Sequence, residues 1–181
     1  MRVTGFAQMA VVGVGMMLAA PAWAETAAEI DAGVQAARDA CAADIAGCEA
    51  AAEKAQGMLV FPKVTKGAIG VGGSYGEGAL IVDDRPAGYY STAAASIGLQ
   101  LGGETYSQII MFTTSEALAD FRNSSGWEAG ANAKVAMIDQ GKAADVNSLI
   151  ADNPVVAFIF GQKGLMGDLS VQGSKITKLD R

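Results

Sequence analysis

The sequence predicts an α+β fold in which Ala-rich N-terminal helices are packed on a Gly-rich, strongly curved or closed antiparallel β-sheet. Three observations carry this prediction: an Ala-rich, acidic segment at 25–56, β-prone runs from Gly57 onward, and 23 glycines among 181 residues. The glycine content is close to twice the usual ~7%. Because glycine inside a strand permits tight bends and close backbone approach, we expect the sheet to curve strongly.

The first 24 residues have the features of a secretory signal peptide. Arg2 provides a positive start, residues 6–20 are an apolar stretch, and Ala22-Trp23-Ala24 is a small-x-small cleavage site. We expect cleavage between Ala24 and Glu25, which leaves a single periplasmic or secreted domain, 25–181. A retained membrane anchor is the rival interpretation, but the apolar stretch is shorter than the ~20 residues that span a bilayer. Loss of Arg2 changes the formal net charge from −6 to −7.

The segment 25–56 is predicted to form one broken helix or two short ones. Ala and Glu favour helix, and apolar residues recur at spacings of three and four, at Ile30, Val34, Ala37 and Cys41. On one straight helix, Cys41 and Cys48 would lie about 10 Å apart, too far for a disulfide. Because glycine commonly ends helices, Gly47 favours two helices joined by a tight turn and a Cys41–Cys48 disulfide. Two buried free thiols in a continuous helix are the alternative.

From Gly57 onward the sequence predicts closely spaced strands joined by short turns. The β-prone runs are 58–61, 67–73, 79–82, 97–101, 108–112, 155–160, 169–172 and 175–179. Turns are predicted at the glycine-rich segments 72–76 and 161–164 and at 83–88. One short helix is predicted near 114–124, because Thr113 and Glu116 have the spacing of a capping box.

The residues that could carry chemistry do not form a recognisable catalytic set. The sequence contains no histidine, which excludes His-dependent triads and His metal sites. Ser74 lies in a G-x-S-x-G pattern, but a nucleophile elbow needs a strand-to-helix turn and a base. Asp83 and Asp84 are typical of a solvated turn rather than of a metal site. We expect no enzyme activity, no metal and no cofactor, and the acidic balance disfavours nucleic acid.

The segment 161–167 has two interpretations. Leu165 and Met166 lie between glycines and close to Lys163, and exposed apolar residues beside a cation are typical of a membrane-surface contact. The alternative, which the residues alone favour, is an ordinary turn in which Leu165 packs inward.

Four blocks of the sequence, in this order, are similar to the SYLF domain family: 57–67, 71–78, 98–103 and 161–174. The resemblance covers about Ala40 to Asp180 and fits the small exported bacterial members, which consist of a signal peptide and this domain. It implies a non-enzymatic module that binds lipid or a membrane surface. The lipid-binding candidates that follow are Lys63, Lys66, Tyr75, Lys163, Leu165 and Met166.

The chain departs from the family's eukaryotic relatives in its N-terminal helical segment. Residues 25–56 contain Arg38 and Lys54 as the only cations, against seven acidic residues, so an anionic surface would repel this segment. We therefore do not carry over phosphoinositide specificity, and actin is not an expected partner of an exported bacterial protein. The alternative function is an envelope protein–protein interaction or structural module without lipid dependence.

Overall fold

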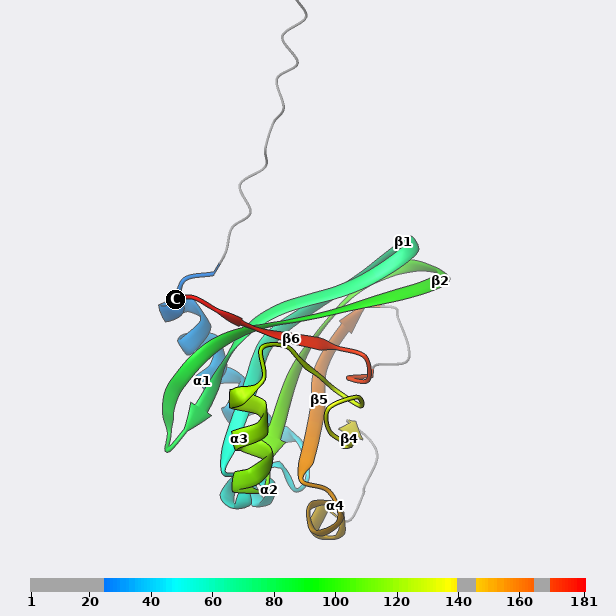
Figure 1. Ribbon diagram of the computed structural model, residues 1–181. Coiled ribbons are helices and arrows are strands. Elements are labelled where there is room, and N and C mark those ends of the chain that lie inside the picture. The colour runs from blue at the N-terminus through cyan, green and yellow to red at the C-terminus, as the bar shows by residue number, and fades with distance from the viewer. Residues whose placement is uncertain (1–24, 140–145, 165–169) are drawn as a thin grey trace, which may run out of the picture.

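A curled β-sheet forms the centre of the structure, a computed structural model that describes residues 25–139, 146–164 and 170–181. Helices α1 (Ala27–Asp44) and α2 (Cys48–Lys54) cover one face of the sheet, and α3 (Ser115–Asn123) covers the other (Figure 1). The predicted α+β class with a strongly curved sheet is confirmed.

Six strands make up the described part of the sheet. They are β1 (Gly57–Val82), β2 (Arg85–Phe112), β3 (Trp127–Glu128), β4 (Val135–Asp139), β5 (Val155–Gly164) and β6 (Lys175–Leu179). Their order is β3-β6-β2-β5-β4, with β1 paired to β2. All described pairs between strands are antiparallel except β4–β5, which is parallel. The sheet is therefore mixed, because the unpredicted helix α4 (Val146–Asp152) lies in a crossover connection from β4 to β5.

The two longest strands, β1 and β2, form a continuous antiparallel ribbon that turns at Asp83 and Asp84. The turn predicted at 83–88 is therefore confirmed at its first two residues, whereas the other four begin β2. Both aspartates have positive φ, 51° and 57°, which a two-residue type I′ turn requires. The turn predicted at 72–76 is wrong, because these residues lie inside β1. The turn predicted at 161–164 is also wrong, because these residues extend β5, and residues 170–172 of the last predicted runs are not in a strand.

The glycines of β1 let its two halves approach each other where the ribbon folds back. A Cβ atom added to Gly76 would lie 2.7 Å from the carbonyl oxygen of Lys63. A Cβ atom added to Gly78 would overlap the carbonyl oxygen of Val60 and lie 2.8 Å from Cδ1 of Phe61. Real Cβ contacts are longer than this, so any side chain at either position would push the two halves of β1 apart. These glycines serve close backbone approach rather than a turn.

The core between the N-terminal helices and the sheet is built on the predicted apolar face of α1. Its four residues, Ile30, Val34, Ala37 and Cys41, are all buried. They share one cluster with sheet residues that include Val60, Ile109 and Phe158. Burial of each large aliphatic or aromatic side chain contributes about 1.5–3 kcal/mol, so packing on the sheet contributes most of the stability of this Ala-rich helix.

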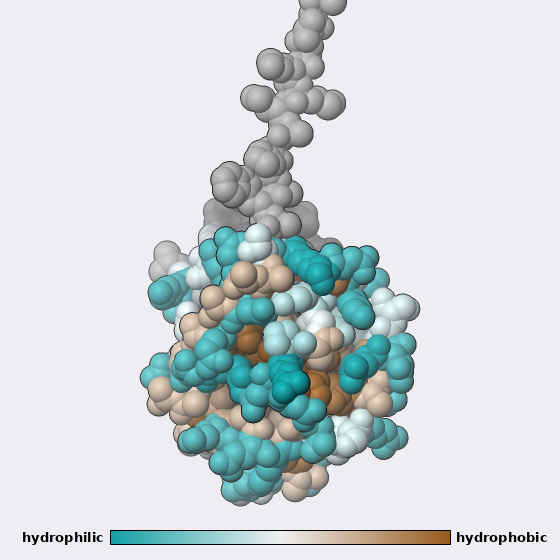
Figure 2. Space-filling view, turned by 90° about the vertical axis from the view of Figure 1, so that its left-hand side faces the viewer, coloured by the Kyte–Doolittle hydropathy of each residue, from teal (hydrophilic) through white to brown (hydrophobic). Residues whose placement is uncertain are grey.

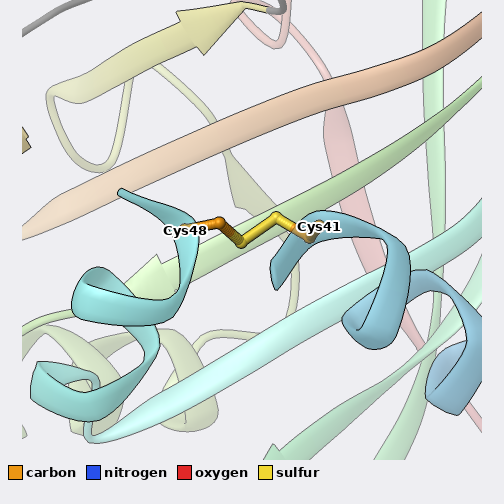
Figure 3. The surroundings of a disulfide bond; sticks show 2 residues. All are labelled: Cys41 and Cys48. Atoms are coloured by element: carbon orange, nitrogen blue, oxygen red, sulfur yellow. A yellow bond between two sulfur atoms is a disulfide. The ribbon is translucent and has the colours of Figure 1, made fainter. Parts of the chain in front are cut away.

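A turn at Ile45–Gly47 separates α1 from α2, and the predicted disulfide crosses it. Gly47 has φ 83°, a left-handed conformation that costs glycine little. The turn brings the Cα atoms of Cys41 and Cys48 to 5.9 Å, and their sulfur atoms are bonded (Figure 3). The alternative of two free thiols in one continuous helix is therefore wrong.

The opposite core lies under α3 and is aromatic. The ring of Phe121 lies 5.0 Å from Tyr90, 4.8 Å from Phe112 and 5.8 Å from Trp127, measured between centroids. The predicted helix is confirmed, but its cap is Thr114, whose hydroxyl accepts a hydrogen bond from the Ala117 amide. The aromatic cluster fixes the position of α3 on β2.

Polar side chains dominate the surface on the side of α1 and the C-terminus. Figure 2 shows this face with small apolar areas separated by polar side chains. Among the residues with described side chains, Tyr75 is the large hydrophobic residue that stands out as exposed, at 52%. Within the described part of the chain, each helix is too short or too polar to cross a membrane.

Candidate functional site

Two of the predicted lipid-contact residues, Lys66 and Lys163, lie near the bend of the β1–β2 ribbon, which is formed by residues 68–71 of β1 and 96–101 of β2 (Figure 1). Lys66 of β1 is opposite Glu104 of β2, and Lys163 of β5 is opposite Thr105, the next residue of β2. Since neighbouring strands are about 4.8 Å apart, the two lysine backbones are separated by roughly 10 Å. The structure thus brings together two cations that are distant in the sequence.

The side chains of Lys66 and Lys163 point to opposite faces of the sheet. Residues directly opposite each other in adjacent strands share a face, and successive residues of a strand alternate. The register therefore places Lys66 with Glu104 on one face and Lys163 with Thr105 on the other. The two lysines do not form one cationic pocket, but both can reach a surface that meets this end of the ribbon edge-on.

Lys63 and Tyr75 lie close to each other through the fold of β1. The close approach of Gly76 to the Lys63 carbonyl places the backbones of these segments in contact, and both side chains are exposed. The Tyr75 hydroxyl donates a hydrogen bond of 2.8 Å to Glu77, whose carboxylate forms an ion pair with Arg181 at 2.8 Å. Burial of the hydroxyl and this hydrogen bond raise the pKa of Tyr75. Tyr75 is thus a neutral aromatic residue anchored on Glu77. Because successive side chains of a strand alternate, it points away from the face on which Gly76 meets Lys63.

The other two predicted contact residues, Leu165 and Met166, lie outside the described residues. The chain reaches them directly from Gly164, the end of β5, which is opposite Glu104. The point from which this segment leaves the sheet is therefore in the same row as Lys66.

The bend of the ribbon has an apolar sequence, and its residues were predicted only as parts of strands. Residues 68–71 read Ala-Ile-Gly-Val and residues 96–101 read Ser-Ile-Gly-Leu-Gln-Leu. The register pairs Ile69 with Leu101 and Val71 with Ile97. This part of β1 and β2 projects beyond the rest of the sheet, and β5 ends beside it (Figure 1). The alternation of apolar residues in each segment is visible in the sequence. That the two segments pair at one projecting end follows only from the strand register.

The geometry offers no catalytic arrangement around Ser74. Ser74 lies inside β1, whereas a nucleophile elbow sits on a strand-to-helix turn. Its hydroxyl interacts with the Tyr106 hydroxyl, and burial is the main cause that raises the pKa of Tyr106. In the described part of the chain, no three His, Cys, Asp or Glu residues are grouped in a way that could hold a metal ion.

Comparison with known proteins identifies the family. No curated protein matches the sequence. The sequence profile of the family described as "Ysc84: Las17-binding protein actin regulator" matches residues 93–181, which include most of β2 and all later elements. This is the family of SYLF domains that the ordered sequence blocks resemble, although the match begins well after Ala40. The resemblance to the SYLF family is therefore confirmed over residues 93–181, which match the Ysc84 family.

Proposed function

We propose that the protein is a non-enzymatic lipid- or membrane-binding module that is exported and cleaved after Ala24. Similarity of residues 93–181 to a family of binding proteins supports the general class. The observation that carries the lipid proposal is the projecting end of the β1–β2 ribbon, where an apolar sequence meets Lys66, Lys163 and the segment that contains Leu165 and Met166.

The proposed contact combines apolar insertion with attraction to anionic headgroups. Each cation near an anionic leaflet contributes about 1 kcal/mol, and the contribution decays within a Debye length. Removal of two cations should therefore weaken binding by about 2 kcal/mol, or roughly 30-fold. The net charge of −7 after cleavage opposes binding to anionic membranes at long range, so orientation of the cationic end toward the surface is part of the proposal.

Liposome co-sedimentation tests the proposal with two variants that remove the same charge. Lys66→Gln with Lys163→Gln removes two cations from the proposed contact. Lys134→Gln with Lys175→Gln takes two exposed cations from elsewhere and is the control. We expect roughly 30-fold weaker binding to anionic vesicles for the first pair only. Equal binding by both double variants and the unchanged protein would exclude this end as the electrostatic contact.

The apolar part of the contact needs a separate variant, because salt and charge changes do not test it. Leu165→Asp with Met166→Asp should weaken binding to neutral as well as anionic vesicles, since burial of a charged group in the membrane is costly. Circular dichroism and the unfolding midpoint should stay close to those of the unchanged protein. Undiminished vesicle binding would remove this segment from the proposed contact.

A second candidate function is binding to an envelope protein without lipid dependence. The family description, which names binding to the protein Las17, is the observation that favours it. This alternative expects stable co-purification with a protein partner from an envelope extract and no pelleting with vesicles of any composition. The same two double variants distinguish the candidates, because the lipid contact predicts a change that depends on vesicle charge.

A further inference from the structure

A cavity of about 300 Å³ between α3 and the β2–β6 pair lies away from the bend of the ribbon. Its described lining consists of Ala87, Tyr90, Ala119, Arg122, Asn123 and Lys178. These residues come from the first residues of β2, the C-terminal half of α3 and the end of β6.

The polar groups of the cavity are held by ordered elements. Lys178 is directly opposite Tyr90 in the β2–β6 pair, so the two side chains share a face. Tyr90 is only 6% exposed, and its ring contacts Phe121 at 5.0 Å between centroids. Since Arg122 follows Phe121 in α3, the aromatic contact also sets the position of the guanidinium-bearing residue. The site is thus supported by a buried ring and by strand pairing.

Gly88 lies against Tyr90 and the stem of Lys178. A Cβ atom added there would lie 3.3 Å from Cε2 and 3.6 Å from the hydroxyl of Tyr90, and 3.7 Å from Cε of Lys178. Gly88 also has φ 156°, so a side chain at this position would be strained as well as crowded against the tyrosine. Substitution of Gly88 would therefore disturb both groups.

The charge in this cavity is entirely positive among the residues described. Two other arginines of the protein are paired with carboxylates: Arg38 with Asp84 at 2.7 Å, and Arg181 with Glu77 at 2.8 Å. In the described part of the chain, neither Arg122 nor Lys178 has a carboxylate within salt-bridge distance, and none lines the cavity. Both side chains are exposed, so the cavity presents two cations to solvent in a protein of net charge −6, and an anion would be attracted to this site.

We propose that this cavity is a binding site for a small oxyanion, a phosphate group in particular. A guanidinium supplies paired donors that fit phosphate oxygens, and an ammonium adds a second charge. The Tyr90 hydroxyl and the Asn123 amide supply neutral donors. The C-terminal end of α3 carries a partial negative charge, but Arg122 outweighs it, and the Phe121 carbonyl is already occupied by the amide and hydroxyl of Ser124.

The phosphate could be free or part of a lipid headgroup, and both sources share this chemistry. The proposal does not depend on the membrane contact at the bend. Tyr90 pairs with Gly78 near the turn end of the ribbon, whereas Lys66 pairs with Glu104 on the other side of the bend. Variants at the cavity therefore leave Lys66 and Lys163 unchanged.

The first experiment is an isothermal titration calorimetry measurement in which inorganic phosphate is added to the purified protein. We expect one site per chain, weakened at least tenfold by Arg122→Gln with Lys178→Gln. The control, Lys134→Gln with Lys175→Gln, removes the same charge from exposed positions outside the lining and should bind as the unchanged protein does. Tyr90→Phe removes a single donor while it keeps the ring, and we expect a smaller loss of a few-fold.

Vesicles that contain phosphatidic acid, compared with vesicles of equal charge that contain a carboxylate lipid, distinguish the two sources. Loss of phosphatidic acid binding in the cavity variant, with no binding of free phosphate, would assign the site to a headgroup. Binding of free phosphate that the cavity variant loses would assign it to a soluble ligand. Equal binding by the cavity and control variants in both assays, or no binding in either, would overturn the proposal.

Discussion

Substitution of Gly78 by alanine tests whether β1 crosses itself as the structure describes. The added methyl group would overlap the carbonyl oxygen of Val60 and lie 2.8 Å from Cδ1 of Phe61. Both residues are fully buried, so the neighbouring atoms cannot move into solvent. Overpacking of a well-packed core costs typically 1–3 kcal/mol, and we expect about 3 kcal/mol here because a backbone oxygen must shift.

Urea unfolding measures this loss directly. With an m value of about 2 kcal/mol/M, a loss of about 3 kcal/mol lowers the unfolding midpoint by about 1.5 M. Gly67→Ala is the matched control in the same strand, since no atom lies within 4 Å of the added Cβ, and its effect should stay within about 0.5 kcal/mol. Equal midpoints for Gly78→Ala and Gly67→Ala would refute the proposed close approach of the two halves of β1.

Three further substitutions test the helices. Hydrogen bonds from the backbone amide and the hydroxyl of Thr26 lower the pKa of Glu29, so the cap should stabilise α1 at neutral pH and lose this contribution as the pH falls through the lowered value. Thr26→Ala keeps the amide and removes the hydroxyl, so NMR titration should find the pKa of Glu29 raised part of the way toward its ordinary value, and an unchanged pKa would contradict the side-chain half of the capping box. Replacement of Cys41 and Cys48 by serine should lower the unfolding free energy by about 2.5 kcal/mol relative to the oxidised protein, because the disulfide no longer restricts the unfolded chain. An unfolding free energy that is the same for the oxidised protein and the double variant would contradict this. Phe121→Ala should cost about 3–5 kcal/mol in urea unfolding, and a loss below about 1 kcal/mol would show that α3 is not anchored by its aromatic contacts.

Local sequence was sufficient where one residue type has one structural consequence. The apolar spacing of α1 predicted its four buried residues, and the glycine before Cys48 predicted the break that permits the disulfide. Asp83 and Asp84 predicted the hairpin turn because short polar residues tolerate positive φ. Each of these features depends on contacts within a few residues of chain.

Glycine in β1 was ambiguous, and tertiary contact decided its role. A turn at 72–76 and close backbone approach inside a strand both favour glycine, and the local sequence is the same for either. The structure requires glycine at positions 76 and 78 because β1 returns over Lys63 and Val60. That return is fixed by the register with β2, which the sequence alone does not specify.

Some residues of the proposed sites could be predicted from the local sequence, and others depend on tertiary contacts. Lys163 was found because apolar residues follow it in the sequence, and Lys66 was found through the family resemblance. Arg122 and Lys178 escaped notice, since neither is flanked by other basic residues and each belongs to a different element. They line the same cavity because of the β2–β6 register and the ring contact between Phe121 and Tyr90.

The two proposed sites should bind an anionic surface through different interactions. The ribbon bend combines cations with an apolar segment, so its binding should persist in part at high salt, where exposed charges are screened. The α3 cavity offers charge and hydrogen-bond donors with two alanines as its apolar lining, so its binding should depend on the shape and charge of a phosphate group. Since the sites share no residue, their effects on vesicle binding should add in free energy. A combined variant that weakens binding no more than either double variant alone would show that only one of the two touches the membrane.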